Sequence, residues 1–322
     1  MPELQVKVMT KEVLYSMDSG FREEYELIGY RFGKKGPGEK AACVVGAMRG
    51  NEVQQLYICS KLVQALEKIE KQKGILGENQ ILVIPSVNYL SMNAGRRFWI
   101  GEQTDINREF PGNPKGEPPS RVADAVMQAV TGYRYGIQFA SFYETGEFIP
   151  HVRMMETGLQ STSLANLFGL PYVVTSKPRP FDRRTLNYNW QMKKTDAFSI
   201  YTGATEEVDE EQAMLAVTSV LRFLTRMGII RYQCHNGYIA SVLEEKNLIS
   251  IKCDMAGFFR EKVSINQEVH RGQTLAVILD PYEGKVISKI KSPTDGIVFF
   301  SQKNPLIYQN SIAFRIIKRL HG

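Results

Sequence analysis

With 322 residues, the chain is long enough for two domains of ordinary size and for a large core without disulfide staples. Hydrophobic residues make up 43% of it and charged residues 23%, and these ordinary globular values exclude long disorder and collagen-like repeats. Forty Lys and Arg against 34 Asp and Glu leave a net charge of +6, spread along the chain, which fits small anions as ligands rather than a nucleic acid.

Strands alternate with helices as far as about residue 230. Apolar runs and three- and four-residue apolar spacings predict, in order, a strand over 39–46, a helix from 53 that ends at Gly74, a strand over 81–87, a helix capped by Ser120 and a strand over 135–142. The same patterns then predict a short helix over 164–168, strands over 171–175 and 198–202, and a helix over 206–227. This alternation is typical of an α/β domain with a mixed central sheet flanked by helices.

The pattern changes after residue 247, where short strands alternate with glycine-containing turns and no helical period is visible. It predicts a small all-β, sandwich-like domain of roughly eighty residues at the C-terminus. We therefore expect two domains, an α/β domain over residues 1–235 and a β domain over residues 236–322.

Two absences bear on location and metal content. No run of 18 apolar residues is present, and the N-terminus has no basic segment followed by an apolar one, so we expect a cytoplasmic protein without a membrane partner. The four cysteines stand singly, with no C-x-x-C pair, so neither a zinc knuckle nor a disulfide framework is predicted.

Four segments carry residue types that site chemistry uses: Gly46–Glu52, Asp105–Gly112, Phe148–Arg153 and Ser199–Gly203. Each one alone has a structural interpretation. These interpretations are a helix cap at Asn51, an ion pair between Asp105 and Arg108 in a turn, a packing role for His151, and an ordinary strand aromatic at Tyr201. In the second segment, however, an arginine beside an asparagine is also the donor pair that grips a carboxylate.

Taken together and in this order, the segments resemble the succinylglutamate desuccinylase/aspartoacylase family. The most specific piece is DINREFPG at 105–112, close to the D-L-N-R-x-F-P-G of the family; VIPSVN at 83–88, IPHVR at 149–153 and the glycine-punctuated β region support it. The resemblance covers the chain from about residue 38 onward and implies a zinc-carboxypeptidase-like α/β fold with an added β domain.

The resemblance also implies a reaction, the hydrolysis of an N-acyl amide. A zinc ion held by a His-x-x-Glu pair and a later His activates water, a glutamate acts as general base, and an Asn-Arg pair holds the substrate carboxylate. Asn107 and Arg108 match that last pair, and we predict substrate binding by Asn107, Arg108, Arg49 and Arg153.

Residue by residue, this chain departs from the zinc site that the resemblance implies. Arg49 stands at the first ligand position, Glu52 keeps the second, and Ala140 replaces the later histidine. Tyr201 stands at the position of the general base, and we assign no catalytic residue. Arginine stays protonated and cannot ligate zinc, alanine has no donor atom, and tyrosine is a poor base at neutral pH. We therefore expect neither a metal nor another cofactor.

Arg49 and Glu52 lie three residues apart at a helix start, so their side chains can meet, and the guanidinium can fill the place of the zinc. Arg96 and Arg97 are further candidates to line an anion pocket, and His151 is the histidine that we expect to face the site. In the β domain, Lys285 and Lys303 lack the Met-Lys-Met context of a carrier lysine, so a structural or lid role is predicted there.

Three functions follow from these residues. The favoured one is a family member that has lost zinc-dependent hydrolysis and either binds a small carboxylate-bearing molecule, such as an N-acyl amino acid, or serves as a partner subunit in a homo- or hetero-oligomer. The alternative is an active zinc-dependent N-acyl-amino-acid deacylase that uses Glu52, His151 and either Cys43 or Asp105. The third is a metal-free reaction in which Tyr201 and Arg49 act as acid and electrostatic stabiliser.

Overall fold

The structure is a computed structural model that describes residues 9–18, 23–142 and 145–318. Its first part holds strands β1 (Thr10–Met17), β2 (Tyr25–Gly33), β3 (Glu39–Ala47), β4 (Asn79–Ser86), β5 (Tyr135–Phe139), β6 (Gly146–Met155), β7 (Tyr172–Ser176), β8 (Asp196–Gly203) and β9 (Ser241–Glu244). The α-helices are α1 (Val53–Lys71), α2 (Tyr89–Asn93), α3 (Pro118–Val130), α4 (Leu186–Met192) and α5 (Glu210–Arg226). The 3-10 helices in the described ranges are η1 (Ile106–Arg108), η2 (Thr162–Phe168), η3 (Pro180–Arg184) and η4 (Glu245–Asn247).

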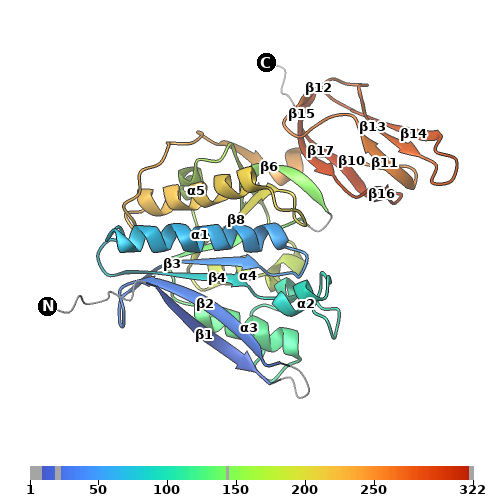
Figure 1. Cartoon of the computed structure of the whole chain (residues 1–322). Helices are drawn as coiled ribbons and strands as arrows, with labels where there is room; N and C mark the ends of the chain where they lie inside the picture. Colours follow the sequence, from blue (N-terminus) through green and yellow to red (C-terminus); the bar gives the residue numbers. More distant parts are fainter. Residues whose placement is uncertain (1–8, 19–22, 143–144, 319–322) are drawn as a thin grey trace.

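The remaining strands are β10 (Leu248–Lys252), β11 (Gly257–Glu261), β12 (Glu268–Val269), β13 (Thr274–Leu279), β14 (Val286–Lys291), β15 (Gly296–Gln302), β16 (Leu306–Ile307) and β17 (Ile312–Lys318). Among the described residues, a large mixed sheet runs in the order β1-β2-β4-β3-β5-β8-β6-β15-β17-β10, with β7, β9 and β12 attached beside this path. A second sheet has the order β14-β13-β11-β16 and lies in the lobe formed by the C-terminal strands (Figure 1).

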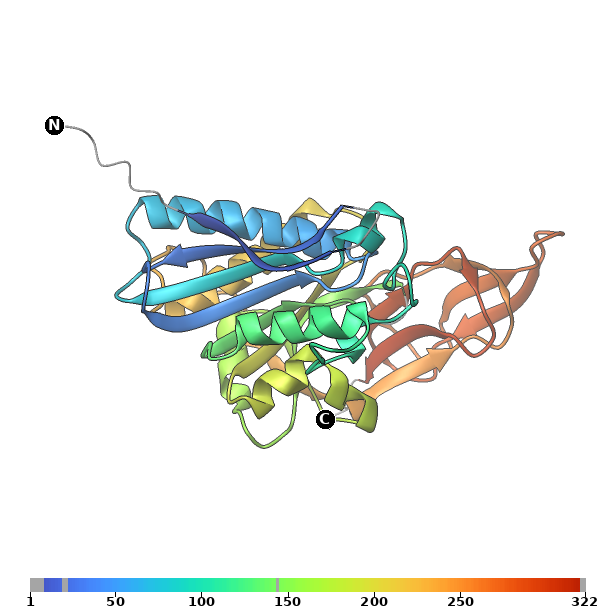
Figure 2. The same cartoon turned by 90° about the horizontal axis from the view of Figure 1, so that it is seen from below.

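Helices cover both faces of the large sheet. One face packs against α1 and α5 through apolar side chains that recur every three or four residues, such as Ile58, Leu62 and Leu66 on α1. The other face packs against α3 and α4, with Val122, Val126 and Trp190 in its core. Figure 2 shows the green helix α3 across this second face. The predicted α/β class, with a mixed sheet between helices and a separate C-terminal β sheet, is therefore confirmed.

Several predicted boundaries were wrong. The helix expected to start at Ser120 begins at Pro118, since proline fits the first helical turn, where its missing N–H is not needed. The helix expected from residue 206 begins at Glu210, because the side chain of Asp209 accepts the Gln212 N–H and caps it. Asn51 is not a cap either: its side-chain amide donates to Glu206 at 2.8 Å.

Strands of the β region extend the large sheet rather than standing apart from it. Strand β15 pairs with the first residues of β6, with Phe300 opposite Phe148, and β17 and β10 follow. Strand β9 pairs with β7, which places residues beyond 235 beside the α/β sheet. The domain boundary between residues 235 and 236 stays a prediction. Within the described ranges, no helix combines the length and the apolar character needed to cross a membrane.

Candidate functional site

A cavity of about 680 Å³ lies at the carboxyl ends of β3, β5 and β8, the edge where ligands bind in open α/β sheets. Six arginines line it: Arg49, Arg108, Arg153, Arg179, Arg184 and Arg315. The other lining residues are Asn107, Gln138, Ala140, Ser141, Phe142, Met154, Met155, Ser176, Phe181, Asp182, Thr185, Asn187, Ser199, Tyr201, Glu245 and Ile312. The structure thus brings the four predicted substrate-binding residues, Ala140 and Tyr201 together around one cavity.

Arg49 lies just beyond the end of β3 and is held by two carboxylates. Its Nη1 lies 3.1 Å from Oε1 of Glu52, and its Nη2 lies 2.8 Å from Oδ2 of Asp105. The side chains of Arg49 and Glu52 are only 6% and 1% exposed, so this is a buried ion pair and not a surface one. Burial alone lowers the pKa of Arg49, but attraction to Glu52 and Asp105 outweighs it and raises that pKa, so the guanidinium stays charged.

Both carboxylate oxygens of Glu52 accept hydrogen bonds from neighbouring groups. Its Oε2 accepts the backbone N–H groups of Met48 and Arg49 at 2.7 and 3.0 Å. Its Oε1 accepts the Ser141 hydroxyl at 2.5 Å in addition to Arg49. The expected contact between Arg49 and Glu52 is therefore present, and it belongs to a network that joins the ends of β3 and β5 to the loop before η1.

These residues do not fit a zinc ion. The guanidinium of Arg49 lies against Glu52, the carboxylate that would have to ligate the metal, and an arginine offers no lone pair. Ala140 carries no donor atom, and the Cys43 thiol contacts the backbone oxygen of Tyr135. Over the described part of the chain, no three His, Cys, Asp or Glu side chains are grouped so that they could hold a metal ion.

His151 is not where we expected it, because it does not line the cavity. It is 1% exposed, its Nδ1 lies 2.9 Å from the Ile149 backbone oxygen, and its ring stacks on Tyr201 at 5.0 Å between centroids. Burial lowers the pKa of His151 to about 3, so the ring is neutral at physiological pH. His151 is thus a packing residue that supports Tyr201 from behind, while Tyr201 itself faces the cavity.

Arg108 and its neighbours form one side of the cavity. Arg108 Nη1 donates to the backbone oxygen of Phe181 at 3.0 Å and lies 3.5 Å from Oδ1 of Asp182. Arg179 contacts the other oxygen of Asp182 at 3.2 Å, and both guanidinium groups lie over the Phe181 ring. The turn interpretation predicted an ion pair between Asp105 and Arg108. The Asp105 carboxylate instead forms an ion pair with Arg49.

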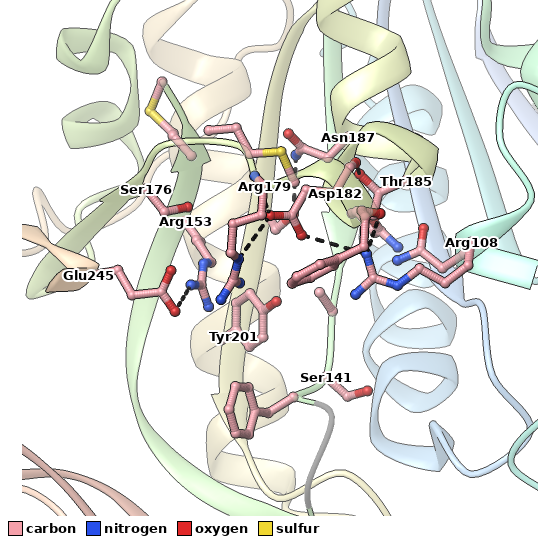
Figure 3. A pocket seen from close by; sticks show the side chains of 18 of the residues that line it. Arg108, Ser141, Arg153, Ser176, Arg179, Asp182, Thr185, Asn187, Tyr201 and Glu245 are labelled. Atoms are coloured by element: carbon pink, nitrogen blue, oxygen red, sulfur yellow. Dashed lines mark hydrogen bonds and ion pairs between the residues drawn. The ribbon is translucent and has the colours of Figure 1, made fainter. Parts of the chain in front are cut away.

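Arg153, Glu245 and Arg315 form the other side. Arg153 comes from β6, Glu245 from η4 and Arg315 from β17, and both arginines contact Oε1 of Glu245. Burial raises the pKa of Glu245, but the charges of Arg153, Arg315 and Arg179 outweigh it and lower that pKa to about 2. Figure 3 shows Arg153 and Glu245 on one side of Tyr201 and Arg108 on the other.

Sequence reasoning missed part of this site and misplaced another part. Four lining residues were not expected, because no local motif marks them: Arg179, Arg184, Arg315 and Glu245. Arg96 and Arg97, which were expected to line the pocket, are not among its lining residues. Arg97 donates instead to the backbone oxygen of Phe142 at 3.3 Å.

Comparison with known proteins identifies the family. The sequence model of the succinylglutamate desuccinylase/aspartoacylase catalytic domain matches residues 38–225, more than half of the chain. This chain belongs to the succinylglutamate desuccinylase/aspartoacylase family. The predicted resemblance is therefore confirmed, and family members supply the remaining comparisons.

One curated protein resembles this chain in sequence, and solved structures resemble it in fold, all at low sequence identity. An N-alpha-acetyl-L-2,4-diaminobutyric acid deacetylase of Halomonas elongata is 22% identical, with 82% of this chain and 78% of that protein covered. A succinylglutamate desuccinylase from Silicibacter sp. superposes with a TM-score of 0.81 at 16% identity, covering 96% of this chain and 94% of that one. The product-bound ectoine utilization protein EutE of Ruegeria pomeroyi gives a TM-score of 0.78 at 17% identity with the same coverage.

Proposed function

We propose that this family member does not carry out zinc-dependent hydrolysis and instead binds a small carboxylate-bearing molecule in the arginine-lined cavity. The observation that carries the proposal is the ion pair of Arg49 with Glu52 and Asp105. The buried, permanently charged guanidinium of Arg49 is paired with Glu52, the carboxylate that would have to ligate a zinc ion. Ala140 at the third ligand position and Tyr201 at the base position agree with this interpretation.

The lining of the cavity supports a carboxylate as the recognised group. Arginine is the side chain that binds carboxylates through two parallel N–H donors, and six arginines face this space. Asn107 and Arg108, which match the substrate-binding pair of the family, both line it. An N-acyl amino acid is one ligand of this class. The same cavity lining is compatible with a role as a ligand-binding partner subunit in a homo- or hetero-oligomer.

The test combines metal content, hydrolysis and binding on one preparation. The protein is purified without chelators and without a metal-binding tag, and zinc per chain is measured by plasma mass spectrometry before and after incubation with excess zinc. The Halomonas elongata deacetylase, prepared identically, is the positive control for hydrolysis. We expect zinc far below one per chain and no hydrolysis of N-acyl amino acids.

Binding is measured on the same preparation by calorimetry with N-acetyl amino acids, for the wild type and for Arg108→Gln. The matched control is Arg260→Gln, since Arg260 is exposed on β11 and outside the cavity. We expect Arg108→Gln to weaken binding about 10-fold or more, as for loss of a charged hydrogen bond, and Arg260→Gln to leave it unchanged. One zinc per chain together with N-acyl hydrolysis would overturn the proposal in favour of an active deacylase.

A further inference from the structure

The second sheet, β14-β13-β11-β16, packs its inner face against strands of the large sheet. Inward-pointing side chains from its four strands belong to one buried apolar cluster: Phe259, Ile278, Ile290 and Ile307. The sheet lies on the side of the C-terminal lobe that faces away from α1 and α5 (Figure 1). Because strand residues alternate between the two faces, the outer face of such a sheet is ordinarily polar.

Four apolar side chains instead form a row across this outer face, one from each strand. Phe258 of β11 lies opposite Leu306 of β16 and opposite Leu279 of β13. Leu279 in turn lies opposite Val286 of β14. Side chains of opposite residues are neighbours, so this apolar row is continuous. Leu306, Phe258 and Val286 are 48%, 39% and 51% exposed, and a contiguous exposed apolar surface is typical of a contact surface.

The two sides of the apolar row carry different residue types. On one side, two residues along the strands, Arg260 of β11 and Lys289 of β14 flank Val277 of β13. On the other side lie Tyr308, which follows β16 and is 74% exposed, and the turn 280–285 that joins β13 to β14. One side is therefore basic, and the other presents an aromatic ring and a turn.

The turn 280–285 presents groups that attract a cation. Asp280 accepts the backbone N–H groups of Tyr282 and Glu283 at 2.8 and 2.7 Å, which fixes the shape of the turn. Tyr282 is 98% exposed, and the side chain of Glu283 is 62% exposed beside Lys285. An exposed tyrosine ring and an exposed carboxylate both bind ammonium and guanidinium groups.

We propose that this outer face joins two copies of the chain around a two-fold axis that runs along the apolar row. A half-turn about such an axis keeps each strand over the same strand of the other copy and exchanges the two sides of the row. The apolar rows then meet, Lys289 of each copy faces the turn 280–285 of the other, and Arg260 faces Tyr308. Each contact occurs twice, as in every isologous interface.

The distribution of charge identifies a second copy as the occupant of this face. The same face supplies both the cations and the groups that attract them, on opposite sides of one apolar row. An axis parallel to the strands would instead set basic side against basic side, and like charges brought together at an interface are unfavourable. These residues lie outside the arginine-lined cavity, so the inference does not depend on the proposed function.

Sedimentation equilibrium of the full chain from about 1 to 100 μM tests the inference, since an interface of this small size should dissociate in the micromolar range. Phe258→Ser should weaken dimerisation about 100-fold or more, because an isologous interface loses the side chain twice. Val13→Ser is the matched control, since Val13 is 51% exposed on β1, at the other end of the large sheet. Leu306→Ser serves the same purpose if Phe258→Ser does not fold.

A charge exchange tests the two-fold arrangement itself. Lys289→Glu places a carboxylate opposite Glu283 of the second copy and should weaken dimerisation about 10-fold. Adding Glu283→Lys restores opposite charges and should bring the dissociation constant back to within about threefold of the wild type. Within one chain the two residues lie on opposite sides of the apolar row, and Glu283 pairs with Lys285, so this restoration arises between copies.

Three results would overturn the inference. The first is a wild type that stays monomeric over the whole concentration range; co-sedimentation of that monomer with phosphatidylserine vesicles, lost in Phe258→Ser, would assign the face to a membrane surface instead. The second is a dimer that persists in folded Phe258→Ser, which would place the interface elsewhere. The third is a double variant that dimerises as weakly as Lys289→Glu alone, which would refute the proposed axis.

Discussion

Replacement of Arg49 by methionine tests whether the buried ion pair is a structural element of this fold. Arg49→Met keeps most of the side-chain volume and removes the charge, which leaves Glu52 and Asp105 without their shared cation. Glu52 is 1% exposed and Asp105 is 11% exposed, so water cannot replace the guanidinium fully. Loss of one partner of a buried ion pair costs about 3–5 kcal/mol of unfolding free energy. Because Arg49 pairs with two carboxylates, we expect the cost of Arg49→Met to lie at the upper end of that range.

Glu52→Gln should cost less than Arg49→Met. The glutamine oxygen can still accept the backbone N–H groups of Met48 and Arg49, and Arg49 keeps its contacts with Asp105 at 2.8 and 3.1 Å. Loss of a charged hydrogen bond then predicts about 1.5–3 kcal/mol. The order of the two variants, and not only their size, follows from this arrangement.

Urea unfolding followed by circular dichroism measures both variants, with Lys34→Met as the matched control. Lys34 pairs with Glu78 at the surface, where the two side chains are 42% and 62% exposed, so its loss should cost at most about 1 kcal/mol. A cost for Arg49→Met as small as that of Lys34→Met would refute the reasoning, as would a larger cost for Glu52→Gln than for Arg49→Met.

Two further predictions concern metal and pH. Arg49→His alone should not bind zinc, because Ala140 still offers no ligand, whereas Arg49→His combined with Ala140→His restores three donors with Glu52 and should take up more zinc by plasma mass spectrometry; stoichiometric zinc in the single variant would contradict this. Burial lowers the pKa of His151 to about 3 from an ordinary 6.5, so its contribution to stability is complete above pH 6.5 and decreases as pH falls toward 3. Between pH 7 and pH 5 the wild type should therefore lose about 2 kcal/mol more unfolding free energy than His151→Phe, and equal losses in urea unfolding would contradict the assignment.

Local patterns predicted the strands and helices whose apolar period is unbroken. The run at 39–46 gave β3 because a strand buried on both faces needs continuous apolar residues, and the spacing from Val53 to Ile69 gave α1. Strand β6 was missed, since Pro150 argues against a central strand. The structure accommodates Pro150 because the pairing of β6 with β8 is irregular between Phe148 and His151, where a backbone donor is not required.

Residue spacing predicted a contact in the candidate site only between residues close in sequence, whereas the family resemblance assigned Arg108, Arg153 and Tyr201 to the site. Arg49 and Glu52 are three residues apart at a helix start, so their contact follows from helix geometry. Arg315 lies 70 residues from Glu245 and farther still from Arg153, and only the pairing of β15 with β6 brings β17 to the cavity. Sequence spacing contains no information about such a contact, which is why Arg315 and Glu245 were absent from the prediction while Arg153 was included.

The DINREFPG segment combines structural and ligand-facing residues, and its retention in this chain has two separate explanations. Asp105 accepts the Asn107 backbone N–H and pairs with Arg49, so it holds the loop whether or not a ligand binds. Asn107 accepts the Leu186 backbone N–H at 3.2 Å, which also ties the loop to α4. Arg108 differs from both, since its side chain is 33% exposed and lines the cavity. Of these three residues, Arg108 is thus the one whose presence argues most directly for a ligand.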